Sequence, residues 1–284
     1  MVILRSLTVQ DIGEAKMLSD AESWNQTEKD WEFIIRNPGN LCLAAEIGGK
    51  LVGTATAMSY EGKIAWIGMV LVHREYRGKG ISKLLLSEIL ETGNSFISVK
   101  LDATPAGQNV YQGLRFKDEF LIHRMSVDSV PAIDWQLKNE KQLELLTLEN
   151  ISEVTETDRR TFGADRTSLL QFLLANYPEN AWIIRKNSRL NGFAFGRKGT
   201  RSYEIGPLTA TTTEEAKVLI LKMLSILEGE SVIVDILEDK KDLLNWLLSI
   251  GFKQNRHLIR MYRDENKIPR NTKNQFLICG PEFG

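Results

Sequence analysis

One stretch constrains the fold more than any other. An apolar run, a short basic turn with two glycines and an amphipathic helix follow one another without interruption. Residues 67–72 are apolar and rich in β-branched side chains, which predicts a strand buried on both faces. Residues 81–90 space their leucines and isoleucines at helical intervals. The stretch therefore predicts a buried strand that leads through a turn into a helix.

The turn has the composition of an anion-binding site. The first amides of a helix point out of its first turn, and the helix dipole adds roughly half a positive charge there. Gly78 and Gly80 would let the main chain approach a phosphate closely, and Arg77 and Lys79 add positive charge. A basic surface loop with turn glycines would look similar. The strand, loop and helix in this order favour the anion site.

Two common phosphate-binding patterns do not fit the turn. A P-loop would need G-x-x-x-x-G-K-[ST], and a dinucleotide turn would need G-x-G-x-x-G, of which Gly78-x-Gly80 lacks the third glycine. The stretch resembles the acetyl-CoA loop of the GNAT N-acetyltransferase superfamily, [RQ]-x-x-G-x-[GA], with Arg77, Gly80 and Ser82 at the three fixed places. Ser82 replaces the family's glycine or alanine. The resemblance implies that acetyl-CoA is the co-substrate and that these residues contact it: Val70, Leu71, Val72, Arg77, Gly78, Lys79, Gly80, Ile81 and Ser82.

The composition narrows the class of partner. The 284 residues have a net charge of −1, 43% hydrophobic residues and 26% charged residues, as in a soluble globular protein. This balance predicts no nucleic-acid partner and no membrane partner, and no run of ~18 apolar residues occurs. Cys42 and Cys279 have no metal-ligand spacing, so we expect no metal and a cytoplasmic, reducing location.

The segments around the turn follow the order of a GNAT domain. Strands are predicted at 41–47, 51–58 and 63–72 before the loop, and at 96–101 after the helix. In GNAT proteins the loop between the first two helices faces the acceptor. The resemblance therefore makes Trp24 and Asn25 candidate acceptor contacts, with Glu22 beside them. Trp24 could instead cover the edge of the core.

A tyrosine lies at the place where the family has its general acid. The segment 109–116 resembles the family pattern Y-x-x-x-G-F, with Tyr111 and Phe116 at the aromatic positions and Arg115 where glycine is usual. The resemblance implies that Tyr111 protonates the departing thiolate of coenzyme A. A phenol with a pKa near ~10 is protonated at neutral pH and can share its proton. The alternative is a tyrosine packed on the sheet.

The second half of the sequence echoes the first. Phe116 and Arg124 recur as Phe252 and Arg260, both at an offset of 136 residues (252 − 116 and 260 − 124). A helix at 214–228 and a strand at 232–237 correspond to the helix and strand that follow the loop. Duplication is the simplest account of this order.

The second copy lacks the residues of the first copy's site. Residues 206–215 occupy the place of the loop without R-x-x-G-x-G, and Glu214 and Glu215 would repel a phosphate. Trp246 or Leu247 stands near the place of Tyr111. We expect a GNAT-like domain without acetyl-CoA binding, whose Asp165 could hold a cationic amine or pair with its neighbour Arg166.

These observations predict an α/β (α+β) protein of the tandem, two-domain bacterial GNAT type. An acetyl-CoA-binding domain would span 1–130, a linker 131–138 and a divergent GNAT-like domain 139–284. Each domain would be a mixed, mostly antiparallel sheet flanked by helices. The apolar tail, 278–284, is expected to dock on a domain.

The predicted activity is the transfer of an acetyl group from acetyl-CoA to a primary amine of a small molecule. The amine would attack directly, and Tyr111 would protonate the leaving sulfur. An ammonium must first lose a proton, for which Asp102 and Glu22 are candidate bases. The alternatives are a non-catalytic acyl-CoA sensor and a protein-interaction scaffold.

Overall fold

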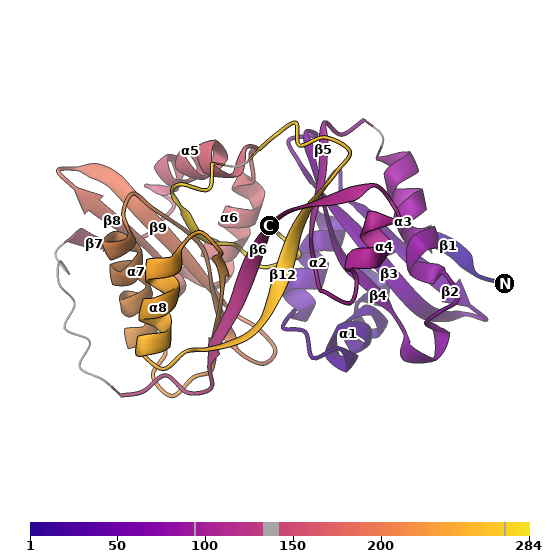
Figure 1. Ribbon diagram of the computed structural model, residues 1–284, viewed down its shortest axis with the longest axis horizontal. Coiled ribbons are helices and arrows are strands. Elements are labelled where there is room, and N and C mark those ends of the chain that lie inside the picture. The colour runs from indigo at the N-terminus through magenta and orange to yellow at the C-terminus, as the bar shows by residue number, and fades with distance from the viewer. Residues whose placement is uncertain (94, 133–141, 270) are drawn as a thin grey trace. The chain divides into compact units, whose positions relative to one another are not determined.

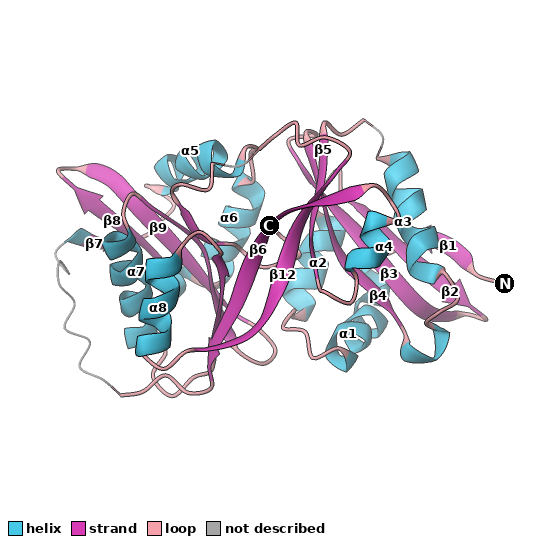
Figure 2. Ribbon diagram, viewed as in Figure 1, coloured by secondary structure: helices cyan, strands magenta, loops and turns pink. Residues whose placement is uncertain are grey.

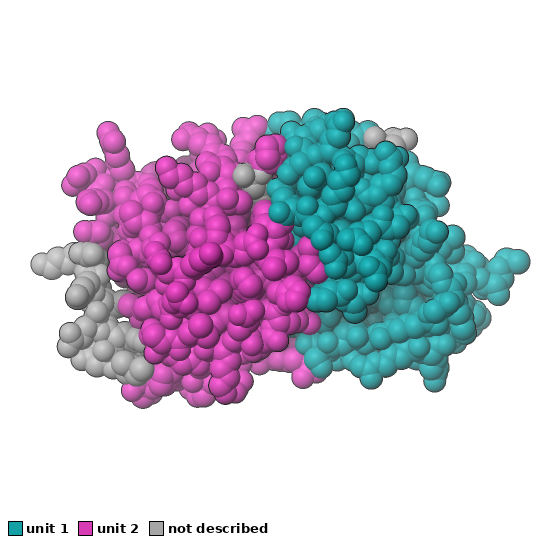
Figure 3. All heavy atoms as spheres, viewed as in Figure 1, with its two compact units in different colours: residues 1–119, 260–268, 281–284 teal, residues 120–259, 269–280 magenta. Residues whose placement is uncertain are grey.

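The computed structural model describes residues 1–93, 95–132, 142–269 and 271–284 (Figure 1). They form two compact units: unit 1 is residues 1–119, 260–268 and 281–284, and unit 2 is residues 120–259 and 269–280 (Figure 3). Each unit contains residues from both halves of the sequence. The predicted linker lies largely outside the described residues, and the predicted domain boundaries at 130 and 139 stay predictions.

Unit 1 contains a sheet whose strands follow the order β1-β2-β3-β4-β5. Neighbouring strands up to β4 are antiparallel, and β4 pairs with β5 in parallel. The elements of this unit are β1 (Ile3–Ser6), η1 (Val9–Asp11), α1 (Ile12–Ala21), α2 (Glu28–Arg36), β2 (Leu41–Ile47), β3 (Lys50–Tyr60), β4 (Ile64–Val72), η2 (Arg74–Tyr76), α3 (Ile81–Thr92), β5 (Ser98–Ala103) and α4 (Gln108–Gln112).

Unit 2 repeats this arrangement. Its strands follow the order β6-β11-β13-β10-β9-β8-β7, and β10 also pairs with β11 in parallel. The elements from here to the end of the chain are β6 (Phe116–Val127), β7 (Leu143–Leu145), α5 (Ile151–Phe162), α6 (Thr167–Asn176), η4 (Pro178–Asn180), β8 (Ala181–Lys186), β9 (Arg189–Lys198), β10 (Tyr203–Ala210), α7 (Thr213–Ser225), β11 (Val232–Leu237), α8 (Lys241–Ser249), β12 (Lys253–Arg263) and β13 (Gln275–Leu277).

The sequence signals produce the expected elements (Figure 2). The apolar run forms β4, the helix after the basic turn forms α3, and the predicted strands at 41–47 and 232–237 form β2 and β11 with those bounds. Gly48 and Gly49 adopt φ of 59° and 78°, which turns β2 into β3. The predicted fold class, α/β with a mixed and mostly antiparallel sheet flanked by helices, is confirmed.

The two faces of the unit 1 sheet carry different helices. A methyl group added to Gly53 of β3 would lie 3.2 Å from Ile81, so α3 covers the face that Gly53 presents. Cys42 pairs with Thr56 and presents the other face, where its sulfur lies 3.6 Å from the carbonyl oxygen of Ile34 in α2. Helix α2 therefore covers the opposite face from α3. Thr56 pairs with Gly68 of β4, so Gly68 presents the α2 face.

Candidate functional site

The turn between β4 and α3 leaves its backbone amides unbonded. Among the residues that the structure describes, no acceptor receives a hydrogen bond from the N–H groups of residues 78–83. Gly78 and Gly80 have φ of 76° and 77°, a left-handed conformation that favours glycine. A methyl group added to either glycine would meet nothing within 4 Å. The turn is an open row of donors at the N-terminus of a 12-residue helix.

Two arginines hold the turn to the end of α1. The Arg77 guanidinium donates to the carbonyl oxygen of Val72 at 3.1 Å and to the Glu22 carboxylate at 2.6 Å. Arg74 donates to the same carboxylate at 3.2 Å. Lys79 lies 4.9 Å from the centre of the Tyr76 ring. The predicted acceptor-facing segment and the basic turn are thus linked by ion pairs.

Glu22 has the environment of an ion-pairing group rather than a base. Partial burial by itself would raise the pKa of its carboxyl group, but the hydrogen bonds from Arg77 and Arg74 outweigh burial and lower it. A carboxylate stabilised in its charged form by two arginines is a weak proton acceptor at neutral pH. We therefore assign Glu22 to fixing the turn.

Strand β4 changes course just before the turn. Thr54 pairs with Leu71 and Thr56 with Gly68, so two β4 residues, Met69 and Val70, lie opposite a single residue of β3. This is a β-bulge, and Met69 adopts φ of 50° within it.

The bulge coincides with the point where β4 and β5 part. Their parallel pairing runs from Ile64 opposite Ser98 to Ile67 opposite Leu101 and then stops. From Gly68 to Val72 the edge of β4 that faced β5 has no strand partner among the described pairings. The three residues predicted to contact the coenzyme, Val70 to Val72, lie on this edge.

Tyr111 lies on the short helix α4, which follows β5. The ring is half-buried and packs edge-to-face on Phe116 with 6.0 Å between ring centres. Its hydroxyl makes no hydrogen bond within the described part of the chain. Burial raises the pKa of the phenol to about 12, so the group keeps its proton at neutral pH.

Asp102 does not have the surroundings of a base. Its side chain is completely buried and accepts two hydrogen bonds from the guanidinium of Arg260, one of them at 2.9 Å. The same guanidinium stacks 4.4 Å from the Trp66 ring. The guanidinium neutralises the charge of this buried carboxylate through two hydrogen bonds. If the carboxylate took up a proton, the ion pair would be broken. We therefore assign Asp102 to holding Arg260 in place.

The other residues predicted to contact the acceptor belong to two different units. Trp24 is half-buried and Asn25 is buried in the connection between α1 and α2. Asp165 belongs to unit 2, where its side chain accepts a hydrogen bond at 2.7 Å from the amide of Thr167, the first residue of α6. Its neighbour Arg166 forms a buried ion pair with Asp158 at 2.7 Å.

The corresponding turn of unit 2 is closed. Helix α7 begins with a capping box, in which the Thr212 amide donates to Glu215 at 3.0 Å and the Glu215 amide donates to the Thr212 hydroxyl at 3.2 Å. The capping box therefore satisfies the amides of Thr212 and Glu215, and two acidic side chains lie in the first turn of the helix.

Unit 2 also fills the gap between its parallel strands. The pairing of β10 with β11 stops at Ile205 opposite Val234, as that of β4 with β5 stops in unit 1. Strand β13 lies in the gap, with Leu277 paired to Leu208 of β10 and to Ile236 of β11. A methyl group added to Gly206 would overlap the carbonyl oxygen of Ile278, so the packing requires glycine there.

The end of the chain docks on unit 1, where sequence reasoning named no site residue. The Trp66 indole donates to the carbonyl oxygen of Pro281 at 2.9 Å, and the Tyr60 hydroxyl donates to that of Phe283 at 2.8 Å. Glu282 lies between them, against Gly68. The only sequence signal was the apolar character of the tail.

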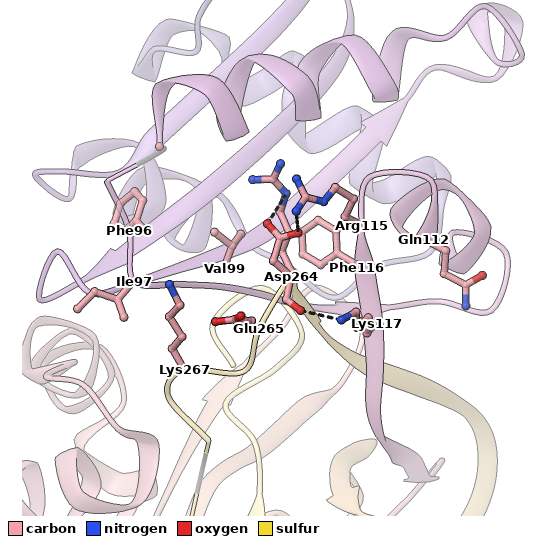
Figure 4. A pocket seen from close by; sticks show the side chains of 12 residues that line it. Phe96, Ile97, Val99, Gln112, Arg115, Phe116, Lys117, Asp264, Glu265 and Lys267 are labelled. Carbon is pink, nitrogen blue, oxygen red and sulfur yellow. Dashed lines mark hydrogen bonds and ion pairs between the residues drawn. The ribbon is translucent and has the colours of Figure 1, made fainter.

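A hollow of about 770 Å³ lies elsewhere in unit 1 (Figure 4). Part of its polar lining is paired: Arg115 lies 2.6 Å from the carboxylate of Asp264, and Lys117 donates to the Asp264 carbonyl oxygen at 2.9 Å. No residue predicted for the coenzyme, the acid or the acceptor lines it. Within the described residues, no group of three or more His, Cys, Asp or Glu side chains could hold a metal ion.

Models of known protein families match a stretch in each half of the chain. The model of the acetyltransferase (GNAT) family matches residues 9–114, and that of an acetyltransferase (GNAT) domain matches residues 154–277. The chain is a tandem GNAT protein. The GNAT family uses acetyl-CoA, and membership makes this chain an acyltransferase.

Two curated proteins are similar to most of the chain. The chain is 24% identical over 266 residues to holothin acyltransferase from Pseudoalteromonas sp. (strain SANK 73390), covering 93% of this chain and 88% of that protein. It is 22% identical over 224 residues to the uncharacterized N-acetyltransferase YitH from Bacillus subtilis (strain 168), covering 78% of each.

Two solved structures have a similar fold over most of the chain. A putative acetyltransferase from Pyrococcus horikoshii superposes with a TM-score of 0.82 and 25% identity, over 100% of this chain and 96% of that one. A tandem GNAT protein from the clavulanic acid biosynthesis pathway superposes with a TM-score of 0.67 and 13% identity, over 92% and 98%. The described helices of this tandem GNAT protein include none long and apolar enough to span a bilayer.

Proposed function

We propose that this protein transfers the acetyl group of acetyl-CoA to a primary amine of a small molecule. The observation that carries the proposal is the row of unbonded amides at residues 78–83, open to solvent at the N-terminus of α3. Backbone donors at a helix N-terminus bind phosphate groups well. The diphosphate of the coenzyme is the ligand we assign to them, with Arg77, Lys79 and Ser82 beside it.

The open edge of β4 is the proposed place for the pantetheine arm. From Gly68 to Val72 this edge lacks a strand partner, and an extended amide-containing ligand can pair with it as an added strand would. The bulge at Met69 and Val70 lies within this edge. We assign the amide of Val70 to polarising the thioester carbonyl.

Tyr111 is the proposed acid. The amine nitrogen attacks the thioester carbon, the C–N bond forms, the C–S bond breaks and the thiolate takes a proton from the Tyr111 hydroxyl. The nitrogen releases a proton to solvent as the amide forms, and Tyr111 recovers a proton from solvent. The unbonded hydroxyl and the raised pKa support this role, because the group is protonated and uncommitted before the reaction. Trp24 and Asn25 remain proposed contacts of the acceptor, and Asp165 of unit 2 remains one only as a prediction.

One coenzyme per chain is a further part of the proposal. Unit 2 has a self-capped α7, acidic side chains at the helix start and β13 in the gap between its parallel strands. Each of these features opposes an anionic, strand-like ligand. We therefore expect unit 2 to bind no acetyl-CoA.

The test is an amine panel assayed for free thiol, with acetyl-CoA binding measured by calorimetry in parallel. We expect saturable thiol release with one class of small primary amine and a stoichiometry of one coenzyme per chain. Coenzyme binding without turnover on any amine would favour a sensor. Absence of binding would overturn the proposal.

A further inference from the structure

The hollow of Figure 4 contains none of the residues assigned to acetyl transfer. Its described lining belongs entirely to unit 1 and comes from the end of α3, the start of β5, the end of α4 and the two ends of β6 and β12 that follow. Gly93, one of the lining residues, ends α3, and this helix is 12 residues long. Because a helix rises ~1.5 Å per residue, the hollow lies ~18 Å along α3 from the open amides at its N-terminus.

The hollow has the size and part of the surface of a small-molecule site. Its volume of about 770 Å³ falls within the range of ~300–1,000 Å³ that such sites occupy. Four apolar side chains line it: Phe96, Ile97, Val99 and Phe116. Phe116 is buried, and Phe96 and Val99 are half-buried. These side chains suit a carbon ring or chain, because contact between apolar surfaces removes both from water.

The polar part of the lining has an excess of positive charge. Its charged residues in the described part of the chain are Arg115, Lys117, Arg263 and Lys267 on the positive side and Asp264 and Glu265 on the negative side. The Asp264 carboxylate lies 2.6 Å from the Arg115 guanidinium and 3.9 Å from that of Arg263. Four cations against two carboxylates leave an excess of two positive charges, which favours an anionic ligand.

Two lysines have donors available for such a ligand. The Lys267 ammonium has no hydrogen-bond or ion-pair partner among the residues that the structure describes. Lys117 uses one of its three donors on the carbonyl oxygen of Asp264, at 2.9 Å. Both lysines are exposed, so each charge alone would attract an anion only weakly. The apolar side chains beside them supply the rest of the binding free energy.

We propose that this hollow binds a small anion with an apolar ring or chain, of the class of the aromatic carboxylates. The apolar side chains hold the carbon skeleton, and the ammonium groups of Lys117 and Lys267 face the carboxylate. This ligand site is separate from that of acetyl-CoA, and it does not depend on the proposed acetyl transfer.

The experiment titrates cinnamate into the protein by calorimetry, with cinnamamide, which has the same ring and no charge, as the matched probe. Lys267→Glu reverses one charge of the hollow without removing a described contact. Lys50→Glu is the control, since Lys50 is another exposed lysine of unit 1 and does not line the hollow. We expect saturable binding of cinnamate, weaker by at least about 10-fold in Lys267→Glu than in Lys50→Glu. Cinnamamide should bind wild type more weakly than cinnamate does, with equal affinity for the two variants.

A second titration, with acetyl-CoA at saturation, separates the hollow from the coenzyme site. The affinity for cinnamate should stay the same. Absence of cinnamate binding, equal cinnamate affinities of the two variants, or displacement of cinnamate by acetyl-CoA would overturn the inference while the proposed function stands. A protein that binds cinnamate as expected but binds no acetyl-CoA would overturn the proposed function and leave this inference in place.

Discussion

Replacing Tyr111 with phenylalanine removes one hydroxyl and little else. The hydroxyl makes no hydrogen bond among the described residues, and the ring contact with Phe116 at 6.0 Å between centres is retained. We therefore expect the free energy of unfolding to change by no more than about 0.5 kcal/mol. Loss of a positioned general acid lowers the rate by about 10²–10⁴-fold, which is about 3–5 kcal/mol of activation free energy.

The assay is thiol release in a single turnover, with acetyl-CoA affinity measured separately. The rate should fall in the variant while the affinity stays unchanged. Tyr203→Phe in unit 2 is the matched control, because that ring is also half-buried and packs near Lys198 at 5.5 Å. Because burial raises the pKa of Tyr111 to about 12, the wild-type rate should not decline between pH 7 and 10 through loss of this proton. A rate for Tyr111→Phe within threefold of wild type would refute the acid role.

Three further substitutions test the structural account. Gly206→Ala should displace the β13 segment and lower the thermal midpoint, whereas Gly229→Ala, where a methyl group meets no atom within 4 Å, should cost only about 1–2 kcal/mol of backbone strain. Asp102→Asn should destabilise unit 1 by about 3–5 kcal/mol, because it removes the negative charge that pairs with the buried Arg260. A variant that is stable but inactive would instead support a role for Asp102 as the base. Asp11→Asn tests pH dependence. Hydrogen bonds from a neighbouring arginine hold the pKa of Asp11 at about 2, so its stabilisation of about 2 kcal/mol is present above pH 4 and is lost as pH falls toward 2. The difference in unfolding free energy between wild type and Asp11→Asn should shrink over that range, and a constant difference would contradict the assignment.

The local features of the fold were predictable from the sequence. The strand, turn and helix around Gly78 and Gly80 are set by neighbouring residues, and their order alone indicated an anion site. The same holds for the hairpin at Gly48 and Gly49. Short-range patterns decide such features because turns and helix ends are built from a few consecutive residues.

The features that sequence reasoning missed depend on distant partners. Asp102 looked like a base because Arg260, which neutralises it, lies 158 positions further on. The contacts that place Glu282 join residues more than 200 positions apart. Strand β13 is three residues long and carries no pattern that distinguishes it from a loop. Pairings of this kind are fixed by the tertiary fold and not by local preference.

Strand β13 also offers a reason why two similar halves would have different roles. In unit 1 the gap beyond Ile67 and Leu101 has no strand in it among the described pairings, whereas in unit 2 the equivalent gap holds β13. The two halves share one fold, and the contents of this gap differ between them. We therefore expect a single active site per chain.

The most direct test of the central claim is the affinity for acetyl-CoA of two variants at one position. Asn and Asp have the same shape, both tolerate a left-handed backbone, and a Cβ atom added at residue 80 meets nothing within 4 Å. Gly80→Asp adds a negative charge beside the unbonded amides, and Gly80→Asn does not. If those amides bind the diphosphate, calorimetry will show acetyl-CoA binding at least about 10-fold weaker to Gly80→Asp than to Gly80→Asn, equivalent to ~1.4 kcal/mol or more. Equal affinities for the two variants would show that the coenzyme binds elsewhere.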